Sequence, residues 1–333
     1  MALIGTINSG NNLTFKNKLI NGNFDFWQKS TSGTPATIWA YVSADRWGGH
    51  HDGTAGTYSR STNVPDSAST YSMRMTGTSG GGGAYLDQRV EASEMREIIA
   101  KGAVTVSGWI RRVGGPTASL TMNLICPTAK DDYSGYTTHG AVFSVNNTIT
   151  GNATAGSSTM SLTDNDTWYY FTMTDTSIAS RTNIANGAQF YFAVGGLNAN
   201  TKYFEFSRIQ VEAGSVATPF EFRPPSVELA LCQRYFQRYG TPSSGRGFQF
   251  YSGNSAAGDS NQAAIGLTWP VTMRIGPSFT LGTLYDSNGN VNSQSMAPQG
   301  TTTMWVWTYN NSGNFSSNGK IYYYDYFDVS AEL

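Results

Sequence analysis

Charged residues are scarce in this chain of 333 residues. Only 13% are Asp, Glu, Lys or Arg, against about 25% in an ordinary soluble domain. The 21 basic residues nearly balance the 22 acidic ones, which gives a net charge of −1. The sequence has no basic stripe of the kind that binds nucleic acid or an anionic membrane surface. We therefore expect neither nucleic acid nor a membrane surface as a partner.

Cysteine, histidine and long apolar runs are also scarce. The two cysteines, Cys126 and Cys232, each lie in an apolar pattern, which predicts buried free thiols. The three histidines form no H-E-x-x-H or Cys/His spacing, so we expect no catalytic zinc. No run approaches the ~18 apolar residues of a membrane helix, and the N-terminus lacks the cationic region of a signal peptide. We expect no membrane insertion and no secretion leader.

Neutral polar and aromatic residues are abundant where a typical soluble domain would have charged ones. Between about 21 and 223, apolar residues alternate with Thr, Ser and Asn, as in "VTVSGWIRRV" at 104–113 and "ASLTMNLICP" at 118–127. Gly-rich and Asn-rich turns separate these runs. Many short strands with almost no helix predict a jelly-roll β-sandwich. One short helix is expected inside it, over "EASEMREIIAKG" at 91–102, where a glycine ends the pattern.

The stretch "PFEFRPPSVELALCQRYFQRYG" at 219–240 breaks the alternation. Its two prolines end the strand pattern, and a helix over 224–240 is predicted, with Ser226 as N-cap and Gly240 as terminator. In a helix, one arc would be apolar and would cover a core. The opposite stripe would be polar and is a candidate oligomer interface: Gln233, Arg234, Gln237 and Arg238.

The expected fold class is mainly β, with four parts along the chain. They are an N-terminal attachment arm (1–20), a jelly-roll sandwich (21–223), a linking helix (224–240) and a smaller C-terminal β-domain (241–333). The arm carries apolar residues that would dock onto a partner or a neighbouring copy, or would form an edge strand. The helix would either connect the two domains at an oligomer axis or pack on its own domain.

Several blocks of the sequence match a known pattern in order. They are "NKLINGNFDFWQKST", "YVSADRWGG", "AYLDQRVEASEMREIIAKGAVTVSGWIRR", "FSRIQVEAGSVATPFEFRPPSVELALCQRYFQRYG" and "WPVTMRIGPSFT". Together they resemble phage tail-fibre or receptor-binding proteins with a carbohydrate-binding-module-like jelly roll. The resemblance runs from about 17 to 280, and 211–239 is its most specific part. It implies a homotrimeric virion protein, made in the host cytoplasm, which recognises a host surface glycan.

Sugar sites combine exposed aromatic rings with neutral hydrogen-bonding groups. By neighbourhood, five aromatic residues are candidates for contacting glycan, although each could instead pack in a core: Trp39, Tyr41, Trp109, Tyr133 and Tyr136. The turn at 309–315 and the tyrosines at 322–326 are candidates for a receptor-binding tip.

The resemblance also implies a structural calcium ion, and no other cofactor is expected. Asp25 in "NGNFD" matches the family's first acidic position. The second acidic position is not reproduced, because Ser207 and Arg208 stand there, so Glu205 or Glu212 would have to substitute.

An enzyme is not expected. "GTSGG" around Ser79 satisfies G-x-S-x-G, but further glycines follow where a nucleophile elbow needs a helix. Two alternatives to a non-enzymatic adhesin stay open. One is a structural capsid-decorating fibre or connector. The other is a glycan-degrading fibre, with Asp131 and Asp132, or Asp164 and Asp166, as the carboxylate pair.

Overall fold

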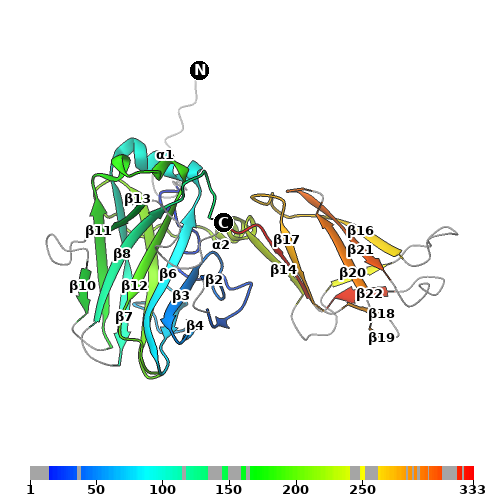
Figure 1. Cartoon of the computed structure of the whole chain (residues 1–333), viewed down its shortest axis with the longest axis horizontal. Coiled ribbons are helices and arrows are strands. Elements are labelled where there is room, and N and C mark those ends of the chain that lie inside the picture. Colours follow the sequence, from blue (N-terminus) through cyan, green and yellow to red (C-terminus); the bar gives the residue numbers. More distant parts are fainter. Residues whose placement is uncertain are drawn as a thin grey trace, which may run out of the picture.

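The computed structural model shows two lobes joined near α2 (Figure 1). The larger lobe is a β-sandwich, and the smaller is formed by C-terminal strands. The structure describes residues 15–35, 39–114, 118–133, 145–148, 159–162, 166–240, 248–251, 262–282, 284–286, 289–290, 293–298, 300–309, 321–324 and 326–333. The expected fold class is confirmed: the chain is mainly β, with a short helix and a smaller C-terminal β region.

One layer of the sandwich is a six-stranded sheet in which all neighbours are antiparallel. Its long central strands are the alternating runs of the sequence. Across the sheet the strands are β1 (Ser32–Gly33), β4 (Thr57–Ser61), β5 (Ser72–Thr76), β13 (Tyr203–Ala213), β7 (Val104–Val113) and β11 (Trp168–Asp175).

The other layer is a seven-stranded antiparallel sheet. Six strands follow one path, and the seventh, β9, pairs with β8 off that path. In order, the path is β10 (Thr159–Leu162), β8 (Ala118–Cys126), β12 (Ala188–Val194), β6 (Gly81–Val90), β3 (Gly48–Gly53) and β2 (Ala40–Tyr41), with β9 at Val145–Thr148.

The core lies between these two sheets. Because side chains alternate along a strand, one face of each sheet supplies the core and the other faces outward. Val106 and Ile110 of β7 are fully buried and belong to the same cluster as Leu86 of β6 and Phe190 and Phe192 of β12. Burying each such side chain contributes about 1.5–3 kcal/mol to the free energy of unfolding.

The predicted helix at 91–102 is confirmed as α1 (Ala92–Lys101). Gly102 ends it in the left-handed conformation, with φ of 67° and its N–H bonded to the carbonyl of Ile99. Met95 and Ile98 bury one face of α1 in the core. Two short 3₁₀ turns, Ile178–Ser180 and Ile184–Asn186, lie beside this helix.

The helix predicted over 224–240 is too long. The structure places α2 at Pro225–Gln233, and residues 236–240 form β14 (Phe236–Gly240). β14 pairs with β23 (Tyr326–Ser330) in an antiparallel register, Phe236 opposite Ser330. The C-terminal strands therefore begin earlier than the expected boundary at 241.

The smaller lobe contains three short antiparallel sheets. The sheet beside the sandwich contains β14, β23 and β17 (Ser278–Leu281). The second contains β15 (Phe248–Tyr251), β22 (Ile321–Tyr324), β18 (Leu284–Asp286) and β19 (Gly289–Asn290). The third contains β16 (Gln262–Thr268), β21 (Thr303–Tyr309) and β20 (Ser293–Pro298).

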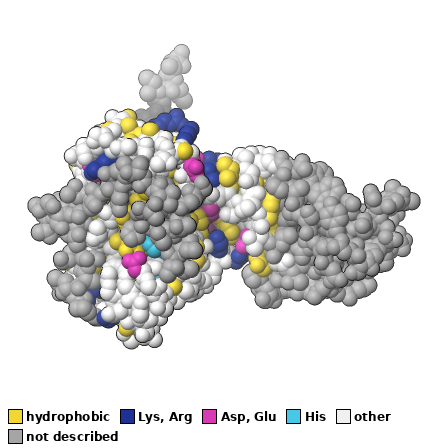
Figure 2. Space-filling model, viewed as in Figure 1, with side chains coloured by type: hydrophobic (Ala, Val, Ile, Leu, Met, Phe, Trp, Pro, Cys, Tyr) yellow, Lys and Arg dark blue, Asp and Glu magenta, His cyan; other side chains and the backbone are white. Residues whose placement is uncertain are grey.

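Two connections tie the smaller lobe to the sandwich, and the C-terminus lies between the lobes beside α2 (Figure 1). On the β14 side, Gln28 donates to the carbonyl of Phe236 and Arg238 donates to the carbonyl of Lys29. After β23 the chain returns to the sandwich, where Arg46 pairs with Glu332. Figure 2 shows charged and hydrophobic side chains meeting at this junction.

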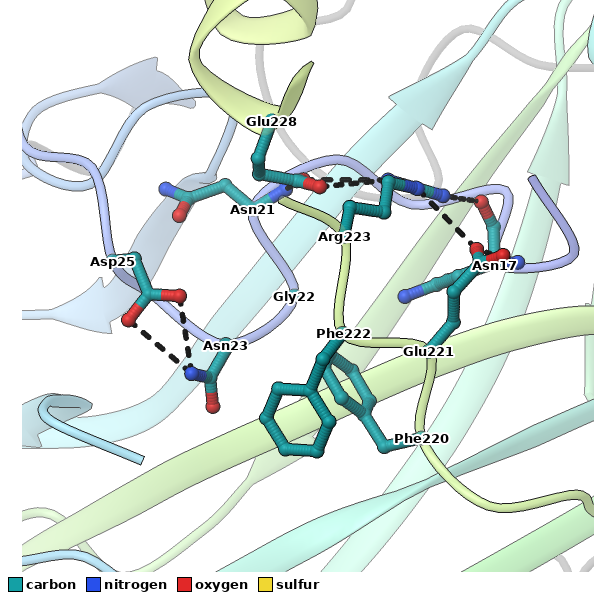
Figure 3. A pocket seen from close by; sticks show the side chains of 10 residues that line it. All are labelled: Asn17, Asn21, Gly22, Asn23, Asp25, Phe220, Glu221, Phe222, Arg223 and Glu228. Atoms are coloured by element: carbon teal, nitrogen blue, oxygen red, sulfur yellow. Dashed lines mark hydrogen bonds and ion pairs between the residues drawn. The ribbon is translucent and has the colours of Figure 1, made fainter. Parts of the chain in front are cut away.

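Two blocks that carried the sequence resemblance form one clasp (Figure 3). Arg223 pairs with Glu221 and Glu228, and it donates to the backbone carbonyls of Asn17 and Leu19. The Glu221 carboxylate in turn accepts from the N–H groups of residues 16 and 17, at 3.3 and 3.1 Å. Residues 15–20, assigned to the arm on sequence, are thus bound to the sandwich, and residues 1–14 lie outside the described part.

Candidate functional site

The outer face of the seven-stranded sheet carries aromatic and polar side chains in register. Leu86, Phe190 and Phe192 point into the core, so their neighbours along β6 and β12 point away from it. The strand pairing then aligns these outward residues in rows across β8, β12, β6 and β3. The rows are Thr121, Ala193, Tyr85 and His50; then Asn123, Tyr191, Asp87 and Gly48; then Ile125, Gln189 and Arg89.

At one end of this face, Tyr85 forms an aromatic platform. Its ring stacks on His50 with centroids 4.3 Å apart and planes 7° apart, and its hydroxyl donates to Asp52 Oδ2 at 2.6 Å. Tyr85 is half-buried and Asp52 is exposed. Gly83 has no side chain between them: a Cβ there would lie 3.0 Å from Asp52 Oδ2. Figure 2 shows histidine, acidic and hydrophobic side chains together on this side of the lobe.

Trp39 lies on the same face, one row deeper. Its ring occupies the space above Gly48, where a Cβ would lie 2.3 Å from the indole. Its Nε1–H donates to Asp87 Oδ1, and the Arg89 guanidinium stacks 3.5 Å from the indole centroid. The absence of a side chain at Gly48 therefore leaves the room that the indole occupies.

Asp87 Oδ2 and Gln189 Nε2 are buried polar atoms of this face that have no hydrogen-bond partner within the described part of the chain. Both side chains are 0% exposed. An unpaired buried polar atom costs about 1–3 kcal/mol, so each of these atoms gains from any group that forms a hydrogen bond with it. Burial raises the pKa of Asp87 to about 7, against the opposing effects of the Arg89 charge and the Trp39 hydrogen bond. We call Tyr85, Tyr191, Trp39, Asp52, Asp87 and Gln189 the Tyr85 face.

Three of the five aromatic candidates from the sequence meet around two buried arginines. Trp39 and Tyr41 contact each other edge to face, with centroids 4.5 Å apart. Arg46 Nη1 donates to the hydroxyl of Tyr41, and Arg89 lies 5.0 Å from the ring centroid of Tyr133. Burial raises the pKa of Tyr41 to about 12, against the opposing charge of Arg46. Tyr133 is buried and donates to the carbonyl of Val90, so its role here is packing.

The other two aromatic candidates lie elsewhere. Trp109 is on β7 in the six-stranded sheet, the opposite layer of the sandwich, beside Tyr170. Tyr136 is outside the described residues, as are most of the residues from 309 to 315 that were expected to form a receptor-binding tip.

The three carboxylates expected to hold calcium have different partners. Asp25 accepts from Asn23 and Glu212 accepts from Thr218, whereas Glu205 accepts from Ser61, Arg74 and Arg111. Among the described residues, no group of three or more His, Cys, Asp and Glu side chains could hold a metal ion. The expected ligand set is thus not assembled here, and calcium binding stays a prediction.

The polar stripe expected on the linking helix does not exist as one face, because its last two members lie on β14. Each member that the structure places has a contact within the chain. Arg234 pairs with Glu91, and Arg238 pairs with Asp328. Gln237 donates to the carbonyl of Gln233. A role of these residues in an oligomer interface stays a prediction.

Sequence reasoning missed the central residues of the Tyr85 face. Tyr85, Asp87 and Arg89 alternate with core residues along "AYLDQRV", and Gln189 and Tyr191 do so along "AQFYFAV". The sequence did contain a signal for this site, namely an aromatic residue (Tyr85) and an ionisable residue (Asp87) on the outward side of one long strand. Both cysteines are free and buried, as expected.

Comparison with solved structures finds partial likenesses. The enzymatically active domain of bacteriophage CBA120 tailspike protein 4 matches with a TM-score of 0.34 and 13% identity, over 60% of this chain and 21% of that one. TmCBM61 in complex with β-1,4-galactotriose matches at 0.33 and 12%, over 60% and 99%. A family 11 carbohydrate-binding module of Clostridium thermocellum matches at 0.31 and 12%, over 57% and 99%.

Similarity at these TM-scores gives no information about what this chain binds. No family model and no curated protein sequence matches the chain. Within the described residues, no helix is long and apolar enough to cross a membrane.

Proposed function

We propose that the sandwich binds a glycan on the Tyr85 face, and that the chain is a non-enzymatic phage virion fibre protein which uses this face to recognise a host surface. The observation that supports glycan binding most directly is chemical. The Tyr85 ring adjoins the exposed carboxylate of Asp52, and the unpaired atoms Asp87 Oδ2 and Gln189 Nε2 lie one and two rows behind it.

A sugar ring has an apolar face and a rim of hydroxyl groups, and the Tyr85 face offers a partner for each. The half-buried Tyr85 ring supplies an apolar surface. Asp52 supplies an acceptor for a hydroxyl at the accessible end. Deeper in the face, a hydroxyl could donate to Asp87 Oδ2 in the second row or accept from Gln189 Nε2 in the third. Such a ligand would have to displace Trp39 from Asp87 Oδ1.

The proposed virion role is supported by the sequence resemblance to phage fibre proteins. It is also supported by the fold, in which two blocks that carry this resemblance contact each other. Two of the resembling blocks, near 17–25 and 219–228, form the Arg223 clasp. In the virion, a homotrimer would present the glycan sites, and the N-terminal residues would bind another virion protein. Light scattering on the intact chain measures the trimer directly, and a monomer at all concentrations would contradict it.

Glycan cleavage is the alternative that one observation favours. A carboxyl with its pKa raised to about 7, as burial gives Asp87, is suited to donate a proton at neutral pH. Asp87 is nevertheless 0% exposed, and Trp39 and Arg89 lie over it. Release of reducing ends from a bound glycan, lost on Asp87→Asn, would replace the adhesin proposal with a hydrolase.

The decisive experiment is binding of the intact chain to an array of oligosaccharides, followed by calorimetry with the best ligand. Tyr85→Ala should weaken binding about two- to tenfold, because an aromatic contact contributes about 0.5–1.5 kcal/mol. Asp52→Asn should weaken it less. Tyr71→Ala is the matched control, since it removes a half-buried tyrosine that immediately precedes β5 of the opposite sheet. Equal affinity in the Tyr85 and Tyr71 variants would sink the assignment of this face, and an array without any binding would favour a purely structural fibre.

A further inference from the structure

The outer face of the six-stranded sheet carries a second aromatic cluster. Antiparallel pairing places Tyr170 of β11 opposite Trp109 of β7, and Ser207 of β13 on the other side of Trp109. In the adjacent row, Trp168 lies opposite Arg111. The rings of Trp109 and Tyr170 have centroids 5.4 Å apart and planes inclined at 59°.

The rest of this face is covered by the chain itself. Thr105 donates to the carbonyl of Gly214, and Gln210 bonds to the segment around Thr218 and Glu221. Residues 214–221 therefore cover the part of the face that contains Thr105 and Gln210. The closure does not extend to β11, because the Tyr170 side chain is 47% exposed and Trp109 and Trp168 are half-buried.

The polar groups around these rings are held in place. The Trp168 indole N–H donates to Asn63 at 3.1 Å. Arg208 lies 5.4 Å from the Trp109 ring centroid and pairs with Asp66 at 2.6 Å. These contacts orient the rings before any ligand arrives, which reduces the entropy lost on binding.

The charges around the cluster balance. Arg208 is paired with Asp66, and Arg111 is paired with both Asp166 and Glu205. Glu205 also pairs with Arg74 at 2.7 Å. Three arginines thus face three carboxylates, and none is left to attract a charged ligand. A face of this kind suits a neutral ligand with an apolar side and hydroxyl groups.

We propose that Trp109, Tyr170 and Trp168 form a second sugar-binding platform, selective for neutral saccharides, on the sheet opposite the Tyr85 face. This inference rests on the proposed glycan-binding function and extends it, because one chain would then contact glycan on both layers of the sandwich. Two weak sites on one chain raise the avidity for a polymer or a dense surface without any new contact. We call the three residues the Trp109 platform.

The test uses the intact chain and two sets of probes. One set contains neutral gluco-, galacto-, manno- and xylo-oligosaccharides, and the other contains sialylated and uronic-acid oligosaccharides. Tyr170→Ala removes an exposed ring and should weaken binding of a neutral oligosaccharide five- to tenfold. Trp109→Ala should weaken it at least as much, with circular dichroism to confirm the fold. Tyr71→Ala again serves as the control.

The pattern across variants separates this inference from the proposed function. Binding that falls in both Tyr85→Ala and Tyr170→Ala supports two platforms. Binding that falls in Tyr85→Ala alone overturns the Trp109 platform and leaves the Tyr85 face standing. Binding that falls in Tyr170→Ala alone supports the Trp109 platform and overturns the Tyr85 face. Stronger binding of acidic than of neutral probes to the Tyr85→Ala variant overturns the neutral selectivity.

Discussion

The two outer faces of the sandwich are built by the same alternation of side chains but are covered in different ways. On the seven-stranded sheet, Trp39 and two buried arginines cover one end, and polar atoms are left unpaired beneath them. On the six-stranded sheet, residues 214–221 close one half by hydrogen bonds and leave Tyr170 exposed on the other. Side chains are thus packed more closely at the covered end of the first face than around Tyr170 on the second, so substitutions there should lower the free energy of unfolding more.

The largest effect on stability is expected from Arg46→Ala. Arg46 is 1% exposed, pairs with Glu332, and stacks 3.6 Å from the ring centroid of Tyr235. Removing one partner of a buried ion pair leaves the other charge unpaired, so the free energy of unfolding should fall by about 3–5 kcal/mol. Urea denaturation measures it.

Arg208→Ala is the matched control for Arg46→Ala, because it removes an arginine of an ion pair on the six-stranded sheet. Its partner Asp66 is exposed, and pairs of that kind contribute about 0–1 kcal/mol. Similar losses in the two variants would contradict the difference between the faces.

The next largest effect is the pH dependence caused by Asp87. Its pKa is about 7 in the folded chain, above the ordinary value of 3.8, so the folded state binds the proton more tightly. The stabilisation is complete below about pH 4 and is lost as the pH rises through 7, a change of up to about 4 kcal/mol. Asp87→Asn should remove this slope, and thermal melting across pH 3–8 measures the difference between the two profiles.

Other titratable groups also change the stability with pH. The contribution of Asp87 is therefore taken from the difference between the wild type and Asp87→Asn. Burial raises the pKa of Asp45 to about 6, which acts in the same direction. Burial lowers the pKa of His51 to about 4, so that stability falls as the pH decreases from 6.5 to 4. Hydrogen bonds to Ala68 and Arg208 lower the pKa of Asp66, so Asp66→Asn should give a smaller change of opposite sign. If the stability of the wild type and of Asp87→Asn changed with pH in parallel, Asp87 would contribute no pH dependence. Its carboxyl group would then be solvated in the folded chain.

An intermediate effect is expected from Gly48→Ala. The new Cβ would lie 2.3 Å from the Trp39 ring, and the indole must move off Asp87. Overpacking of this kind lowers stability by about 1–3 kcal/mol. Near-ultraviolet circular dichroism should report the displaced tryptophan. Gly195→Ala, which meets nothing within 4 Å, is the control.

The smallest effect on stability is expected from Tyr170→Ala. Because this side chain is exposed on an edge strand, its removal should change the free energy of unfolding by less than about 0.5 kcal/mol. The same variant should lose affinity for neutral oligosaccharides in the binding experiment described above. A loss of stability comparable to that of Gly48→Ala would mean that the ring packs rather than binds.

Local patterns were sufficient for the strands and for α1. The run at 104–113 alternates so regularly that β7 and its two faces could be predicted, and Gly102 marked the end of α1. The pattern failed at 236–240, where aromatic residues at 235, 236 and 239 fit a helix as well as a strand. What decides is the pairing of β14 with β23, about ninety residues later in the chain, which no local signal contains.

The binding faces depend even more on distant pairing. Trp39 was identified from its polar neighbours, but its place above Gly48 depends on β3 lying beside β6. The row of Tyr191 and Asp87 exists only because β12 pairs with β6, a hundred residues apart in sequence. Trp109 was a candidate on the same grounds, and its strand belongs to the opposite sheet. Sequence can indicate residue types for a site, but sheet order determines which of them meet.

The paired strands β14 and β23 have a mechanical consequence. The chain leaves the sandwich along one strand and returns along the other, and each is secured at its base, by Arg238 to Lys29 and by Arg46 to Glu332. A pull on the smaller lobe would therefore be shared by two strands in parallel, and twisting would be resisted by their ladder of hydrogen bonds. A single flexible linker would let the lobe swivel, whereas this neck transmits both tension and torque.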